Sequence, residues 1–165
     1  MIDCRYAPVM AAYNAEMNRR LFAAAGRLPD EARRLDRGAF WRSIHGTLCH
    51  QLWGDRIWMA LFAGWPRPGV AMAESAGLHQ RFDELQAARV EADAGITQWA
   101  EALDEAWLAG ESTWLSGAAG REMRKPNRLL VVHFFNHQTH HRGQVHDMLT
   151  AAGQRTGDTD LFLIV

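Results

Sequence analysis

The stretch from Pro126 to Gly153 constrains the fold more than any other part of the chain, because it reads as one long helix carrying five of the eight histidines. Pro126 suits a first helical turn, where its missing N–H costs no hydrogen bond, and Gly153 suits a left-handed helix end. Between them an inward stripe recurs at steps of three and four: Leu130, Phe134, His137, His141, Gln144, Val145 and Met148. Imidazoles in a core need partners, so we expect His137 and His141 to share a buried interaction.

This histidine pair has the spacing of half a metal site. His137 and His141 lie one helical turn apart, so both can reach a point about 2.0–2.1 Å from each ring nitrogen, the distance that zinc requires. A solvated or core-bonded histidine cluster is the alternative. His133 with His137, or His137 with His140, would serve geometrically almost as well. A third ligand elsewhere in the chain has to decide the register.

Length and composition predict one compact domain over residues 1–165. Eighteen basic and nineteen acidic residues give a formal charge of −1, which provides no footprint for nucleic acid or an anionic membrane. The N-terminus does not resemble a leader and no apolar run reaches about 18 residues, so we expect a cytoplasmic protein that spans no membrane. Cys4 and Cys49 lack CxxC spacing and are expected to be free thiols.

Helical patterns cover most of the chain and predict an all-α fold. Besides the helix from Pro126, helices are expected at residues 6–26, 43–63 and 78–108, with Ser43 as an N-cap. A Pro- and Gly-containing loop at residues 64–78 is long enough to frame a site. A short turn is expected after Pro29, and residues 110–127 are expected to form a loop with a short extended piece. The terminal DLFLIV is expected to pack on the bundle or on a partner subunit.

His50 is the candidate third ligand. It shares a helix face with Trp53, Ile57 and Leu61 and therefore points into the core. A lone inward histidine is also commonly a hydrogen-bonded core residue, so the interpretation depends on an inward pair from another helix.

Other residues near His50 have structural explanations. Gly46 and Gly54 each cost about 1 kcal/mol in a helix, which indicates either that room is needed beside His50 or that helices pack closely. His45 lies about 140° around the helix from His50 and is a poor co-ligand. Asp55 is expected to cap, pair with or orient another group. Arg89 interrupts the apolar stripe of the third helix and is expected to form a salt bridge or to extend its head to water.

Four main helices around one inward point describe a four-helix bundle with ligands from facing helices. The stretches SIHGTLCHQLWGDRIWMALFAG and HFFNHQTHHRGQVHDMLTAAG, with YNAEMNRRLF before them and TDLF after, resemble the DinB (damage-inducible) family of DinB/YfiT-like bundles over almost the whole chain. In that family one histidine of the second helix and an HxxxH pair of the last hold a divalent ion, usually zinc or nickel. The resemblance implies metal ligands at His50, His137 and His141. Cys49 departs from the polar residue that the family often has there.

Three neutral nitrogens with an open coordination position would allow a metal-dependent enzyme. Gln138 stands where HExxH hydrolases have their general base, so a zincin-type peptidase is not expected. Thiol transfer needs no such base, because a metal-bound thiol is already deprotonated. The resemblance points to bacillithiol-using S-transferases and to the related bundle of the mycothiol-dependent maleylpyruvate isomerase.

We therefore expect a metal-dependent enzyme that activates a thiol, or water in second place, to act on a small-molecule substrate. A non-catalytic metal or small-ligand binding protein of a stress response is the alternative, and a structural metal is the third. Trp53 or Trp58 beside the ion would favour an electrophile-binding enzyme. His45 and His79 are expected to be replaceable without loss of metal. His133, His140 and His146 are expected to lie behind the ligands, to pair with other groups or to lie at the surface. A homodimer is expected from the resemblance, the seven Trp and the apolar tail.

Overall fold

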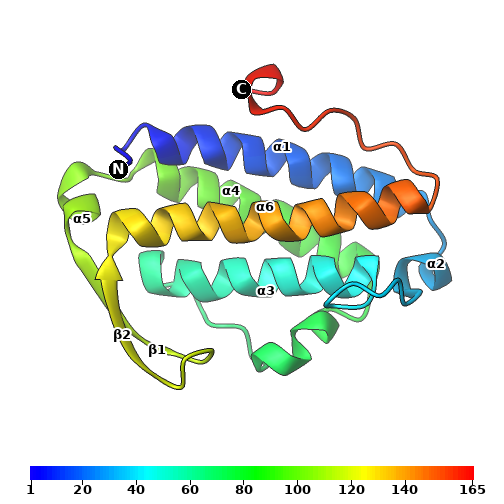
Figure 1. Ribbon diagram of the computed structural model, residues 1–165, viewed down its shortest axis with the longest axis horizontal. Coiled ribbons are helices and arrows are strands. Elements are labelled where there is room, and N and C mark those ends of the chain that lie inside the picture. The colour runs from blue at the N-terminus through cyan, green and yellow to red at the C-terminus, as the bar shows by residue number, and fades with distance from the viewer.

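The computed structural model describes all 165 residues, and most of them are helical. Four long helices run alongside one another (Figure 1): α1 (Tyr6–Gly26), α3 (Ile44–Ala63), α4 (Phe82–Glu101) and α6 (Asn127–Ala151). Helix α1 contacts α4 and α6, and α3 contacts the same two helices. The short elements are α2 (Asp30–Arg34), η1 (Met72–Gly77), α5 (Glu105–Ala109), η2 (Leu161–Leu163), β1 (Glu111–Ser116) and β2 (Arg121–Pro126).

The boundaries of α1 and α3 confirm the sequence prediction. The Ser43 side chain accepts a hydrogen bond from the Gly46 N–H, as an N-cap does. Gly64 ends α3 in the left-handed region with φ 69°. Gly153, with φ 76°, follows α6 in the same conformation. Pro126, expected in the first helical turn, instead ends β2 with ψ 135° and precedes the helix.

The helix predicted from 78 to 108 is wrong at both ends. Leu78 follows η1, and α4 begins only at Phe82. Helix α4 stops at Glu101, and the Asp104 carboxylate then accepts a hydrogen bond from the Trp107 N–H and caps the separate helix α5. The sequence did not indicate this break, because the apolar spacing continues across residues 102–104. Leu108 of α5 joins the same core as Ile96 of α4.

The segment between α5 and α6 is an antiparallel hairpin, which confirms the expected extended piece. Its register runs from Glu111 opposite Pro126 to Ser116 opposite Arg121. Trp114 of β1 meets Trp58 of α3 edge to face, with ring centroids 5.7 Å apart. The hairpin is therefore attached to the helices beside the last turns of α3.

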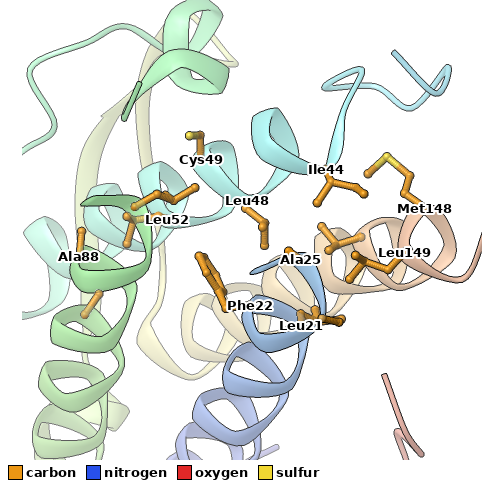
Figure 2. Packing of buried hydrophobic residues seen from close by; sticks show 14 residues of the cluster. Leu21, Phe22, Ala25, Ile44, Leu48, Cys49, Leu52, Ala88, Met148 and Leu149 are labelled. Atoms are coloured by element: carbon orange, nitrogen blue, oxygen red, sulfur yellow. The ribbon is translucent and has the colours of Figure 1, made fainter. Parts of the chain in front are cut away.

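The apolar core consists of two clusters separated along the helices. One contains Leu48 and Leu149, with Cys49 among its side chains (Figure 2). The other contains Met59 and Phe134 and lies nearer the hairpin. Burial of these side chains is the main favourable contribution to folding.

A buried polar layer separates the two clusters and joins all four long helices. Arg89 of α4 pairs with Asp55 of α3 and, at 2.9 Å, with Asp93 of its own helix. Gln138 of α6 donates to Asp55 at 2.9 Å, and Asn18 of α1 donates to Asp93 at 2.9 Å. The expected pairing roles of Arg89 and Asp55 are thus confirmed. Buried charges require such partners, so the layer opposes sliding of one helix along another.

The C-terminal segment lies along α1 without burying its apolar side chains. The Tyr13 hydroxyl donates to the Thr159 carbonyl at 2.7 Å. Phe162 nevertheless remains 77% exposed and Leu163 61% exposed. The expectation that DLFLIV packs on the chain's own helices is therefore wrong, and the partner alternative stays a prediction. None of the helices combines the length and hydropathy needed to cross a membrane.

Candidate metal centre

Helices α3 and α6 bring His50, His137 and His141 together at the edge of the polar layer. One ring nitrogen from each lies within 4.8 Å of the other two. The ring centroid of His50 is 4.7 Å from that of His141 and 5.5 Å from that of His137. His50 and His141 are only 4% and 5% exposed. This cluster includes neither His133 nor His140.

Ser75 of η1 orients the His50 ring. The Ser75 hydroxyl donates its one hydrogen to the Met72 carbonyl at 2.6 Å, so its oxygen is free to accept. His50 Nδ1 lies 2.8 Å from that oxygen and therefore carries the proton in this contact. Nε2 of His50 is therefore unprotonated, and its free lone pair is what a metal ion binds.

The two α6 histidines have unequal support. Nδ1 of His141 donates to Oε1 of Gln144 at 2.8 Å, which leaves its Nε2 as the available atom. This Nε2 lies 3.1 Å from Nε2 of His137 and accepts its hydrogen. Nδ1 of His137 is buried without a hydrogen-bond partner. Two of the three histidines therefore have a hydrogen-bonding partner at Nδ1, and His137 has none.

The cluster is held in the uncharged state. Burial, with a smaller contribution from His141, lowers the pKa of His50 to about 3. Burial followed by neighbouring histidines lowers the pKa of His137 to about 3. Burial also lowers the pKa of His141, against the opposing effect of the Gln144 hydrogen bond. All three are neutral imidazoles near pH 7, as metal ligands must be.

These residues fit a divalent ion of the zinc type. A tetrahedral ion with ligands at about 2.0–2.1 Å separates its nitrogens by about 3.3 Å. The separation of 3.1 Å between Nε2 of His137 and Nε2 of His141 is already close to that value. Three imidazole nitrogens without a carboxylate are a donor set that suits Zn²⁺ and Ni²⁺ better than Mg²⁺ or Ca²⁺.

Gly54 leaves the space that the His137 ring occupies. A Cβ atom on residue 54 would lie 2.6 Å from Cε1 of His137, closer than side chains approach. Gly46 has a different neighbour, because its Cβ would lie 2.6 Å from the Trp41 carbonyl oxygen. The room that the two glycines leave is thus taken by His137 and by the Trp41 backbone, and at Gly54 this agrees with the second alternative, close packing of two helices.

Aromatic rings enclose the cluster. Trp41 stacks on His50 with centroids 3.9 Å apart, and Trp53 stacks on it at 5.7 Å. Trp58 instead contacts His133 at 4.9 Å. Trp41 and Ser75 were not predicted from the sequence, because they lie in an irregular segment and in η1, where no α-helical periodicity identifies an inward face.

The other candidate residues have different partners. Nε2 of His45 and Sγ of Cys49 both approach the His79 carbonyl, at 2.8 and 3.6 Å. Burial raises the pKa of Cys49 to about 11, so this thiol is a core group and not a nucleophile. His146 contacts Thr156 through Nδ1 at 2.7 Å.

Gln138, although next to His137 in sequence, faces the polar layer. It is fully buried and its amide donates to Asp55. A carboxylate at this position would therefore not face the histidine cluster in the way that an HExxH base faces its ion.

Comparison with known proteins supports the family. The family model described as DinB family matches residues 1–164. Neither a curated protein nor a solved structure matches the chain. With the family model covering almost the full length, the chain belongs to the DinB family.

Proposed function

We propose that His50, His137 and His141 hold one divalent metal ion, zinc or nickel, in the core of a single four-helix-bundle domain formed by residues 1–165. The observation that carries this proposal is the convergence of three neutral imidazoles from two facing helices within 4.8 Å. The contact between α3 and α6, together with those of α3 with α4 and of α6 with α1, supports the bundle.

We further propose that the protein is a metal-dependent enzyme that transfers a low-molecular-weight thiol to an electrophile. A bound ion would supply an electrophilic centre that lowers the pKa of a thiol. The donor cluster contains no carboxylate, and Asp55 is already engaged by Arg89 and Gln138. A thiol reaction suits these surroundings better than hydrolysis, because it requires no general base from the chain.

The residues around the cluster have separate roles in this proposal. Ser75 and Gln144 hold the rings of His50 and His141 with their Nε2 atoms turned inward. Trp41 and Trp53 both stack on His50 and shield it from water. Their indole faces also offer an apolar surface for an electrophilic substrate.

The first experiment measures metal. Protein purified without added metal is analysed by elemental mass spectrometry, together with His50→Ala, His137→Ala and His141→Ala. Each variant should lose most of the metal, whereas His45→Ala should keep it. Full retention in all three variants would refute the ligand assignment, and loss only in His133→Ala or His140→Ala would indicate a different register.

The second experiment measures thiol transfer. Cysteine and monochlorobimane are the probes: a C–S bond forms, the C–Cl bond breaks, chloride leaves and the thiol proton passes to solvent. Metal-loaded protein should accelerate this reaction below the free thiol pKa of about 8.5, and apo protein should not. If only ester or amide hydrolysis responds to metal, water activation replaces thiol transfer. If neither responds, the non-catalytic binding protein becomes the better interpretation.

A further inference from the structure

A cavity lies between α3, α4 and the loop that follows Gly64. Its volume is about 550 Å³, within the usual range of roughly 300–1,000 Å³ for small-molecule sites. The lining residues with a bearing on binding are Arg56, Trp65, Arg67, Leu78, Glu91 and Gly95. None of the three clustered histidines belongs to this lining, so the cavity is separate from the candidate metal centre.

The cavity contains guanidinium groups without protein partners. Arg56 of α3 and Arg67 of the loop both line it, and neither forms an ion pair or a side-chain hydrogen bond within the chain. Arg81 and Arg128, by contrast, are each paired with a carboxylate. A guanidinium has five N–H donors in a planar fork that matches a carboxylate. Two such groups on one cavity form a receptor for an oxyanion.

The loop side of the cavity, residues 65–69, is held in place by its own sequence and by contacts within the chain. Trp65 and Arg67 each precede a proline, which restricts both residues to extended backbone conformations. The Trp65 ring rests on Gly95 of α4, where a Cβ would lie 2.5 Å from Cζ2. Farther along, the Trp53 indole donates to the Val70 carbonyl at 2.9 Å. A loop held at these points loses little conformational entropy when a ligand binds in the cavity.

The composition of the lining indicates the chemistry of the ligand. Two arginines and Glu91 leave one net positive charge, which matches a single negative charge better than a dianion. Trp65 and Leu78 add half-buried apolar surface beside those charges. We propose that this cavity binds an organic monocarboxylate with a flat apolar body, with Arg56 and Arg67 holding the carboxylate and Trp65 contacting the body.

The test uses 2-naphthoate as the probe and isothermal titration calorimetry as the measurement. Wild-type protein should bind one equivalent. The neutral isostere 2-naphthamide should bind about tenfold more weakly or worse, because it offers no charge to the guanidinium groups. 2-Naphthyl phosphate should bind no more tightly than the carboxylate, since Glu91 opposes its second charge.

Variants assign the binding to this cavity. Arg56→Ala with Arg67→Ala should weaken 2-naphthoate binding about tenfold or more, and Glu91→Gln should tighten it. Arg121→Ala with Arg155→Ala is the matched control, because it removes the same charge from exposed positions outside the cavity and should change affinity less than twofold. His50→Ala should also keep the affinity, which excludes binding of the carboxylate to a metal ion.

Several outcomes would overturn the proposal. These are no heat of binding at millimolar probe, equal affinity for the amide, tighter binding of the phosphate, equal losses in the two double variants, or loss in His50→Ala. Circular dichroism of each variant verifies that the helices are intact. The proposal is independent of thiol transfer, since the titration needs neither metal nor turnover.

Discussion

Gly54 of α3 lies directly against the His137 imidazole of α6, because a Cβ at position 54 would come within 2.6 Å of Cε1 of that ring. A side chain at position 54 would therefore collide with the ring at the place where the candidate metal centre requires a histidine. A helix normally disfavours glycine by about 1 kcal/mol relative to alanine. Glycine is nevertheless present at position 54, because the imidazole of His137 occupies the space that a side chain would need.

Gly54→Ala should lower metal affinity by at least tenfold, because the added methyl group displaces His137 from the cluster. Competitive titration of zinc against a chromophoric chelator measures the change. Gly143→Ala on α6 is the control, because a Cβ there meets no heavy atom within 4 Å. It should leave metal affinity unchanged and stabilise the fold by about 0.5–1 kcal/mol. Equal affinities of the two variants would contradict the role assigned to Gly54.

Ser75→Ala should weaken metal binding without abolishing it. The substitution removes the oxygen that accepts from Nδ1 of His50, so the ring loses both its orientation and its preferred tautomer. Loss of such an outer partner typically costs about 10–100-fold in affinity. Ser112→Ala, in the hairpin, should bind metal like the wild type. An unchanged affinity in Ser75→Ala would show that the Trp41 stack alone orients His50.

Arg89→Met should destabilise the fold by about 3 kcal/mol or more, since it leaves the buried carboxylates of Asp55 and Asp93 without their cation. Urea unfolding measures this free energy. Arg81→Met, which removes an exposed ion pair with Asp83, should cost much less, because water and salt screen an exposed pair. Similar losses in the two variants would mean that the buried layer contributes no more than a surface pair.

The penalty of Arg89→Met should depend on pH. Burial raises the pKa of Asp93 even in the wild type, where Arg89 opposes the effect. Because the folded-state pKa of Asp93 is raised, the protonated carboxyl favours the folded state. This stabilisation by Asp93 is fully present below the unfolded pKa of about 3.9 and is lost as pH rises through the folded-state pKa. Without the arginine this pKa rises further, so the variant should lose more stability at pH 7 than at pH 5. A pH-independent penalty would contradict this explanation.

Gln138→Glu should destabilise the fold by about 1–3 kcal/mol at pH 7 and should not create hydrolytic activity. The introduced carboxylate would face Asp55, to which the native amide donates at 2.9 Å. Protonation restores a donor, so the loss of stability should diminish as pH falls. Thermal melts at several pH values test the first part, and an ester-hydrolysis assay on metal-loaded protein tests the second.

The exposed apolar tail predicts self-association. Phe162 and Leu163 are 77% and 61% exposed, although both are apolar. We expect sedimentation velocity at micromolar concentration to give a homodimer, and Phe162→Asp with Leu163→Asp to shift it toward monomer. Arg121→Asp, at the exposed tip of the hairpin, serves as the surface control. A wild-type monomer under these conditions would refute the prediction.

The sequence alone was sufficient for the presence of four long helices, for the ends of α1 and α3, and for the inward direction of His50. Ser43 and Gly64 terminate α3 through local backbone chemistry, which requires no tertiary contact. The burial of His50 likewise follows from a helical period that places it on the face of apolar neighbours. The family resemblance added the full set of three histidines, which periodicity by itself had left in more than one register.

Only the tertiary structure decided what depends on contacts between distant segments. The sequence placed a single helix across residues 102–104, because apolar spacing continues through a break that Asp104 creates by capping α5. Ser75 and Trp41 carry no periodic signal, yet η1 and the turn before α3 bring both against His50. Gln138 follows His137 in the chain but points about 100° away around the helix, so packing against Asp55 turned it into the buried layer. Periodicity identifies the face of a helix, whereas only packing determines which neighbour that face meets.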